Sequence, residues 1–179
     1  VIGMGWMGTV HSRAYRSISD RFGDAGISVS LVACADEVAT RALDAQARFG
    51  FKRSTTNWRD VVADPEIEVV VIATSNNTHL EIIQTAATAG KHVFCEKHMA
   101  MNAREATAMA DAANRAQRIL AIDFQSRFEW ETQQAREFVS RGLLGSPHFA
   151  KSSYLRRGGV PTWGTFTSKA MNGGGALID

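Results

Sequence analysis

Three glycines near the start of the chain constrain its fold more than any other feature of the sequence. Gly3, Gly5 and Gly8 have the spacing G-x-G-x-x-G, which is typical of a tight turn from a β-strand into a helix. In such a turn the first glycine allows the bend, the second lets a dinucleotide pyrophosphate approach the backbone, and the third lets helix and strand pack closely. The N–H groups at the start of the helix would point at the phosphates.

The residues around this motif favour the strand–turn–helix interpretation over an ordinary glycine turn, which the motif alone would fit equally well. Apolar Val1 and Ile2 precede the motif. Apolar side chains follow it at helical spacing, namely Met7, Val10, Ala14 and Ile18. A strand usually runs ~5–6 residues, whereas two residues precede Gly3. We therefore expect a fragment of a longer chain, cut within its first strand.

Composition indicates an ordinary globular protein and excludes several classes of partner. Of 179 residues, 45% are hydrophobic and 21% are charged, and the net charge is +2. So small a net charge argues against nucleic acid or a membrane surface as a partner, and no apolar run approaches the ~20 residues of a membrane span. Cys34 and Cys95 stand in apolar runs, as small buried residues of a reducing compartment do. We expect a cytoplasmic protein.

The order of apolar runs predicts a doubly wound α/β fold. Predicted strands alternate with predicted helices, at 29–35, 67–73, 93–95 and 119–122 for the strands and at 38–49, 77–89 and from 102 onward for the helices. Asn102 and Glu105 have the spacing of a capping box. A repeated β-α order implies a parallel sheet with right-handed crossovers, so ligands are expected at the carboxyl ends of the strands.

The pattern changes after Phe124, which indicates a domain boundary. We expect residues 1–124 to form a Rossmann domain that binds NAD(P), with a truncated first strand. Residues 125–179 would begin a second, incomplete α/β domain. It would contain a charged helix over 129–141, a strand over 149–155 and a glycine-rich tail.

Asp36, at the end of the second predicted strand, is the candidate for binding the adenosine ribose. A solvated acid at the start of a helix is the alternative. Asp36 stands 28 residues after Gly8, and the loop over 20–28 accounts for the long interval. Glu37 follows, and no cationic residue comes before Arg41. Since a 2′-phosphate would be repelled by these acids, NAD is favoured over NADP.

Two further segments end predicted strands at the same edge of the sheet. Residues 74–79 read Thr-Ser-Asn-Asn-Thr-His, which suits either helix capping or contact with a cofactor. The other is Cys95-Glu96-Lys97. A lysine is usually a solvated surface residue, but one that follows a buried strand toward a cofactor crevice is a candidate to stabilise a developing alkoxide.

Five motifs together resemble the Gfo/Idh/MocA family of sugar and cyclitol oxidoreductases, over nearly the whole chain and in the right order. They are Gly3-x-Gly5-x-x-Gly8, Thr74-Ser75-Asn76-x-x-His79, Ala89-Gly90-Lys91-His92-Val93-x-Cys95-Glu96-Lys97, Arg127-Phe128 and Gly173-Gly174-Gly175-Ala176-Leu177-Ile178-Asp179. The resemblance implies a Rossmann domain followed by an α/β domain whose open sheet faces the active site and often an oligomer partner. It also implies a homo-oligomer when the chain is full length.

The resemblance implies two catalytic residues. Lys97 matches the lysine of the family's Glu-Lys-Pro motif, which contacts the substrate hydroxyl. Asp179 matches the acid four positions before the catalytic histidine, which would lie beyond the chain. The expected cofactor-binding residues are Gly3, Gly5, Trp6, Met7, Gly8, Asp36, Thr74, Ser75, Asn76, His79, Glu96, Lys97 and Gln125. No metal site is expected.

The sequence departs from the family pattern at three positions. His98 and Ser75 stand where the family commonly has proline, and Gln125 stands where it often has Asn. Without proline at 98 the backbone is less restricted, so the position of Lys97 is open.

The resemblance implies hydride transfer between NAD(P) and a CH–OH group of a sugar, polyol or cyclitol. Two alternatives are kept: an NAD-dependent glycosidase that works by transient oxidation, and a non-catalytic NAD-binding sensor. Lys97 and Asp179 argue against the sensor.

Overall fold

The computed structural model describes residues 1–153, 155, 157–159 and 168–173. The chain divides into two compact units. The first comprises Val1–Asp123 together with the segment that begins at Ser168, and the second is Phe124–Thr167.

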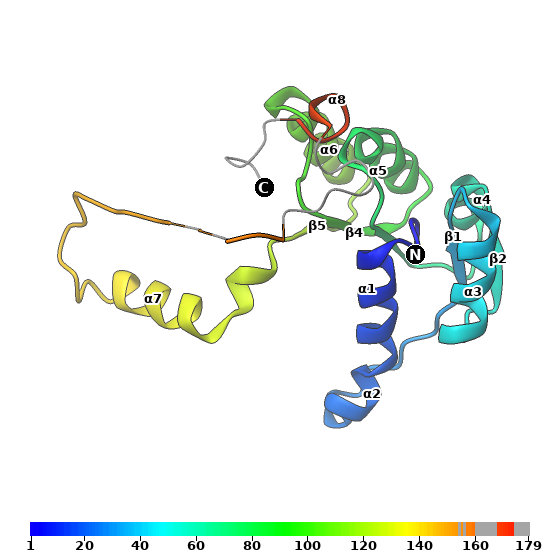
Figure 1. The fold of residues 1–179 in the computed structure, drawn as a ribbon, viewed down its shortest axis with the longest axis horizontal. Coiled ribbons are helices and arrows are strands. Elements are labelled where there is room, and N and C mark those ends of the chain that lie inside the picture. Colours follow the sequence, from blue (N-terminus) through cyan, green and yellow to red (C-terminus); the bar gives the residue numbers. More distant parts are fainter. Residues whose placement is uncertain (154, 156, 160–167, 174–179) are drawn as a thin grey trace. The chain divides into compact units, whose positions relative to one another are not determined.

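The first unit is built on a parallel sheet whose middle position is occupied by the start of the chain (Figure 1). Ile2 forms parallel bridges with Ala35 on one side and with Ile72 on the other. The resulting order is β2-β1-Ile2-β3-β4-β5, and every pairing in it is parallel. The strands are β1 (Ala33–Ala35), β2 (Arg53–Thr55), β3 (Val69–Ile72), β4 (His92–Glu96) and β5 (Leu120–Asp123).

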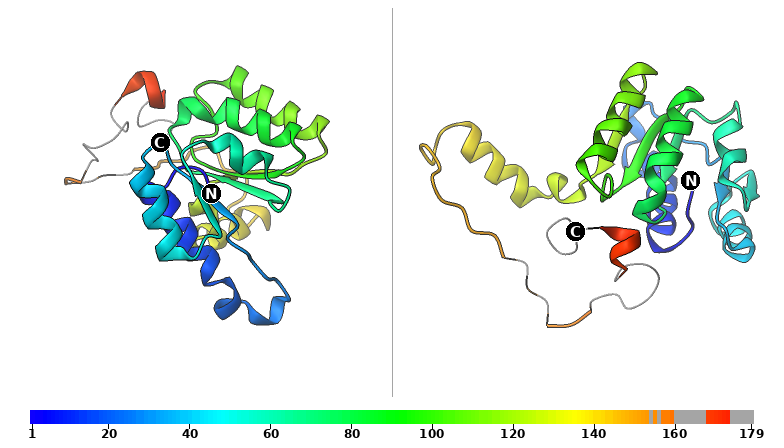
Figure 2. Two further views of the ribbon diagram at one scale, coloured as in Figure 1. Left: turned by 90° about the vertical axis from the view of Figure 1, so that its right-hand side faces the viewer. Right: turned by 90° about the horizontal axis from the view of Figure 1, so that it is seen from above.

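Helices cover both faces of this sheet (Figure 2). One face carries α1 (Trp6–Arg16) and α3 (Ala39–Phe49), and the other carries α4 (Trp58–Ala63), α5 (His79–Thr88) and α6 (Ala103–Arg115). The chain winds outward from the central position in both directions, so the direction of winding changes between Ile2 and β3. This confirms the predicted doubly wound α/β fold. The short helices are α2 (Ile18–Arg21), η1 (Gly23–Ala25), η2 (Asn76–Thr78) and α8 (Lys169–Asn172).

The core is divided between the two faces of the sheet because successive strand residues point in opposite directions. On β3, Val70 and Ile72 pack with Ile83 and Met109 under α5 and α6. Val71 instead joins the cluster of Met4, Phe49 and their neighbours under α1 and α3. From Val70 to Ile72 both faces of β3 are therefore buried, as its unbroken apolar sequence indicates.

Several local predictions are confirmed. The helix predicted over 38–49 is α3, and Gly50 follows it with a φ of 76°. Asn102 caps α6 by accepting a hydrogen bond from the Glu105 N–H at 3.0 Å. The side chain of Glu105 accepts from the Met101 N–H, one residue earlier than a standard capping box would have it.

Two local predictions for the first unit are wrong. The strand predicted over 29–35 is only Ala33–Ala35, because among the described residues none pairs its backbone with 27–30. The expected apolar stripe of the first helix is also wrong. Val10 and Ala14 are exposed, and the buried residues of α1 are Gly8, His11 and Ser12.

The described part of the second unit contains η3 (Gln125–Phe128) and α7 (Trp130–Ser140). The helix predicted over 129–141 is confirmed as α7, and no residue of α7 is buried. The strand predicted over 149–155 is wrong for the described residues of that range, which form no strand. A strand needs a neighbour to pair with, and none of the described residues supplies one.

No helix in the described ranges has both the length and the apolar character needed to cross a bilayer.

Candidate functional site

The glycine turn has a different steric requirement at each of its three positions. Gly3 has a φ of 88°, and a Cβ there would lie 2.6 Å from the Ala73 carbonyl oxygen. A Cβ on Gly8 would lie 1.9 Å from the Gly3 carbonyl oxygen. A Cβ on Gly5 would meet nothing within 4 Å. The fold therefore requires glycine at positions 3 and 8. At Gly5 no protein atom would clash with a side chain, so the space beside its Cα is open to a ligand.

That space lies at the start of α1, and its geometry suits the pyrophosphate of a dinucleotide. Gly5 is the N-cap residue, and within the described chain no side chain caps the helix. Its first N–H groups are then available to a ligand. The two helical residues expected to contact the cofactor here are Trp6, which is 76% exposed, and Met7, which is partly buried.

Asp36 is held in place by one backbone N–H of the glycine turn and by one just after Asp36 itself. Its Oδ2 accepts a hydrogen bond from the Met4 N–H at 2.8 Å, and its Oδ1 accepts one from the Val38 N–H at 2.9 Å. The side chain is buried beside the site. Arg41 Nη1 lies 3.8 Å from Asp36 Oδ1. The expectation that no cation offsets this acid therefore needs correction, because one turn of helix brings Arg41 back to it.

The segment after β3 is joined to the segment after β4 by side-chain hydrogen bonds. Asn76 Nδ2 lies 2.7 Å from His98 Nδ1 and donates to the Asn172 carbonyl at 3.3 Å. Thr74 Oγ1 lies 2.7 Å from Thr78 Oγ1, which donates to the Ser75 carbonyl. The contact between Asn76 and His98 places the 74–79 loop beside the loop that carries Lys97, and the threonine bonds hold the 74–79 loop itself in shape.

His79 supports both loops from below. Its Nδ1 lies 2.9 Å from the His98 carbonyl oxygen, and its Nε2 lies 3.2 Å from the Thr74 carbonyl oxygen. The side chain is fully buried. Burial lowers the pKa of the imidazole, although the Thr74 and His98 carbonyls act in the opposite direction. A side chain without exposed surface cannot contact a cofactor directly, so this position favours a supporting role.

Glu96 and Lys97 end β4 and have different surroundings. Glu96 was expected to contact the cofactor, but its side chain is buried and its Oε1 lies 2.8 Å from His11 Nε2. Its Oε2 accepts a hydrogen bond from the Lys97 N–H at 3.1 Å. Lys97 is partly exposed at the carboxyl edge of the sheet. The Lys97–His98 peptide bond is cis.

Sequence reasoning missed two residues of this edge. His11 lies on the inward face of α1, one turn after Gly8, and Asp123 is the last residue of β5. The signal for Asp123 was available, because it ends a parallel strand in the same way as Asp36. His11 gave a weaker signal: its spacing from Met7 and Ala14 places it on the expected helix face, but the sequence does not show the acidic partners that it meets there.

The structure brings together most of the predicted site residues, but not all of them. Those gathered at the carboxyl edge of the first unit's sheet are Gly3, Gly5, Trp6, Met7, Gly8, Asp36, Thr74, Ser75, Asn76, His79, Glu96 and Lys97. Gln125 belongs to the second unit and is exposed. Asp179 lies outside the described residues. The roles of all these residues in binding and catalysis stay predictions.

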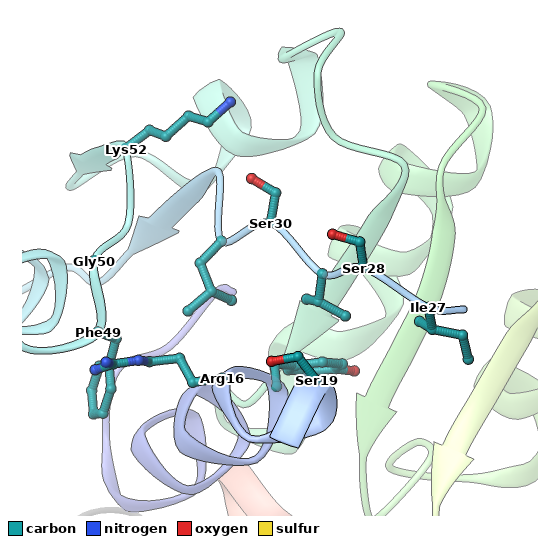
Figure 3. A pocket seen from close by; sticks show the side chains of 11 residues that line it. Arg16, Ser19, Ile27, Ser28, Ser30, Phe49, Gly50 and Lys52 are labelled. Atoms are coloured by element: carbon teal, nitrogen blue, oxygen red, sulfur yellow. The ribbon is translucent and has the colours of Figure 1, made fainter. Parts of the chain in front are cut away.

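A pocket of about 430 Å³ lies at the opposite edge of the same sheet. It forms where α1 and α3 end and where β1 and β2 begin (Figure 3). Its lining includes Arg16, Ile27, Phe49 and Lys52. Because parallel α/β sheets bind ligands at the carboxyl ends of their strands, this pocket is separate from the glycine turn and from Lys97.

Comparisons with known proteins agree with this geometry. The model of an oxidoreductase family with an NAD-binding Rossmann fold, GFO_IDH_MocA, matches residues 1–124. D-glucoside 3-dehydrogenase of Escherichia coli (strain K12) is 36% identical over all of this chain and 49% of its own length. Myo-inositol 2-dehydrogenase of Thermotoga maritima is 30% identical over 83% of this chain and 42% of its own length.

A solved structure gives the same picture in three dimensions. Levoglucosan dehydrogenase in complex with NADH and levoglucosan superposes with a TM-score of 0.75 and 38% identity, over 80% of this chain and 39% of that one. The chain spans about half the length of the curated relatives it matches.

Proposed function

The chain belongs to the Gfo/Idh/MocA oxidoreductase family, and from this membership we propose that the whole protein transfers a hydride between NAD and a CH–OH group of a small carbohydrate. The substrate class is a sugar, a polyol or a cyclitol. The relatives with this chemistry are dehydrogenases of a glucoside, of levoglucosan and of inositol.

One observation carries the proposal: the glycine turn and Lys97 lie at the same edge of one sheet, after strands on opposite sides of the change in winding direction. Gly3 follows Ile2, and Lys97 follows β4, two strands away. A dinucleotide bound across this edge of the sheet would have its pyrophosphate at the start of α1. Lys97 would then stand on the side of the edge where the nicotinamide half is expected.

The residues of this chain have distinct tasks in the proposed reaction. The open space at Gly5 and the first N–H groups of α1 would bind the pyrophosphate, and the buried Asp36 carboxylate would accept hydrogen bonds from a ribose. When bound, NAD supplies the hydride acceptor. The ammonium of Lys97 would donate a hydrogen bond to the substrate oxygen and stabilise the negative charge that this oxygen gains as its hydroxyl proton leaves. The family pattern assigns that proton to the histidine expected four positions after Asp179, and hydride loss from the same carbon then gives the carbonyl group.

NAD rather than NADP is the proposed cofactor, in line with the solved relatives that hold NADH. Asp36 and Glu37 would repel a 2′-phosphate, while Arg41, 3.8 Å from Asp36, reduces that repulsion. Fluorescence titrations with NADH and NADPH measure the difference in affinity between the two cofactors. Asp36→Ala should reduce this difference. If the unaltered protein binds NADPH as tightly as NADH or more tightly, the proposed preference for NAD is contradicted. Homo-oligomerisation and a cytoplasmic location stay predictions.

Replacing Lys97 by methionine tests the proposed chemistry in the full-length protein. Loss of one group that stabilises a transition-state oxyanion typically costs about 10²–10³ in rate. Lys97→Met should lower kcat by that factor while NADH affinity and Tm stay close to the wild-type values. Turnover is measured with a panel of aldoses, anhydrosugars and inositols.

Lys91 offers a matched control, because it is a buried lysine whose Nζ donates to the Asp64 carbonyl at 2.8 Å, away from the site. Lys91→Met should lower Tm and leave kcat of the folded enzyme unchanged. If Lys97→Met turns over normally, or loses activity only by unfolding, the role proposed for Lys97 fails. If the wild-type protein binds NADH but turns over no substrate of the panel, the enzyme proposal fails and the non-catalytic sensor becomes the better account.

A further inference from the structure

Beneath the loop of Lys97 lies a buried polar cluster that the proposed chemistry does not use. It consists of His11 from α1, Glu96 from β4 and Asp123 from β5. His11 Nε2 lies 2.8 Å from Glu96 Oε1 and 3.6 Å from Asp123 Oδ2. All three residues are less than a tenth exposed. Polar groups so deeply buried are stabilised by the hydrogen bonds that they make to one another.

Glu96 is the centre of this cluster. It links the cluster to the loop that carries Lys97. One carboxylate oxygen faces His11, and the other accepts the hydrogen bond from the Lys97 N–H. Burial raises the pKa of Asp123, and the charge of Glu96 and a hydrogen bond with it raise that pKa further, against the effect of His11.

The ring of His11 is fixed in the orientation that this contact needs. It packs edge-on against Phe94 of β4, with ring centroids 5.5 Å apart and an interplanar angle of 84°. His11 also lies on the helix whose first turn borders the open space at Gly5. The helix that would bind the pyrophosphate thus reaches the backbone of Lys97 through two side chains, His11 and Glu96.

We propose that His11 is a positioning residue for Lys97 and acts through Glu96. The bond from His11 holds the Glu96 carboxylate in one orientation, and that carboxylate holds the Lys97 N–H and so the direction in which the lysine leaves the strand. This inference rests on the proposed function, because it assumes that Lys97 meets the substrate. It assigns to His11 no contact with substrate or cofactor.

A pair of amide substitutions at position 11 of the full-length protein tests the proposal. Glutamine can place its amide NH₂ close to where His11 has Nε2, whereas the shorter asparagine cannot reach Glu96. His11→Asn should lower kcat by on the order of 10²-fold, as small misplacements of catalytic groups do, with little change in KM or in NADH affinity. His11→Gln should restore kcat to near the wild-type value.

Ser12→Ala is the matched control. Ser12 is buried on the same face of α1, and its hydroxyl donates to the Gly8 carbonyl at 2.7 Å without reaching Glu96. Its kcat should not change. Equal losses in the Asn and Gln variants, or a normal kcat in His11→Asn, would overturn the proposal. So would a stoichiometric divalent cation held by the wild-type protein and lost in His11→Gln, because the three side chains would then be ligands.

Hydrogen exchange at the Lys97 amide separates this inference from the proposed function. His11→Asn should exchange that amide faster than the wild type, and His11→Gln should not, whether or not the protein turns over a sugar. If no substrate is found but this difference is seen, the positioning contact stands and the proposed function fails. Unchanged exchange in His11→Asn overturns the positioning contact itself.

Discussion

The two units of the chain differ in how their apolar residues are used. In Val1–Asp123, strands and helices bury apolar side chains on both faces of a parallel sheet. In the described part of Phe124–Thr167, α7 buries no residue, and Phe128, Trp130 and Leu144 are mostly exposed. The first unit therefore contains its own core, whereas the described residues of the second unit leave their large apolar side chains exposed.

The site residues predicted from the sequence follow the same division. Asp36, Asn76, His79 and Glu96 are buried and hydrogen-bonded within the first unit. Gln125, in the second unit, is exposed. The contrast indicates that the geometry of the residues at the carboxyl edge of the sheet is specified within the first unit.

The largest expected effect is the loss of a core side chain. Ile83 is fully buried, and Ile→Ala substitutions in cores cost about 2–5 kcal/mol. Leu144 is 62% exposed, so Leu144→Ala in the chain Val1–Asp179 should change the free energy of unfolding by at most about 0.5 kcal/mol. Urea unfolding measures both. A cost for Leu144→Ala as large as that of Ile83→Ala would contradict the contrast between the units.

Two glycine substitutions give the next largest difference. Alanine at Gly8 would place a Cβ 1.9 Å from the Gly3 carbonyl oxygen, and the forced shift should cost about 3 kcal/mol, at the upper end of overpacking. Gly142 in the second unit has a φ of 69°, and a Cβ added there would meet nothing within 4 Å, so Gly142→Ala should cost only about 1–2 kcal/mol of backbone strain. Thermal unfolding compares them, and equal costs would show that the close approach in the turn is not rigid.

The smallest expected effect is a pH dependence at the last residue of the first unit's sheet. Burial raises the pKa of Asp123. Its contribution to stability is therefore greatest below the pKa that it has in the unfolded chain and is lost as pH rises through the higher folded value. Asp123→Asn cannot ionise, so its Tm relative to the wild type should increase from pH 4 to pH 8. Asp44→Asn, at an exposed position of α3, is the control. A Tm difference between variant and wild type that stays constant with pH would show that folding does not raise the pKa of Asp123.

The parts of the fold that the sequence predicted are those in which one local requirement dominates. Gly3 and Gly8 are specified by close backbone contacts, and Gly50 by a positive φ. The unbroken apolar run at β3 could only be buried on both faces. These features need no knowledge of distant residues.

The parts that the sequence could not predict depend on contacts across the fold. His11 is buried because Glu96 and Asp123, which come far later in the chain, meet it at the sheet edge. His79 is drawn inward by carbonyl groups of two loops. Arg41 returns to Asp36 because a helical turn follows the strand. The spacing of residues along the sequence does not show which of these distant groups will meet in the fold.

The most direct test of the account is NADH binding after a substitution at Gly5. A Cβ there would meet no protein atom within 4 Å, and the same is true at Gly23 in η1. Gly5→Val in the full-length protein should therefore keep the wild-type Tm and lose most of its NADH affinity in a fluorescence titration, whereas Gly23→Val should keep both. Undiminished NADH binding by Gly5→Val would contradict the central claim that the dinucleotide lies across the glycine turn.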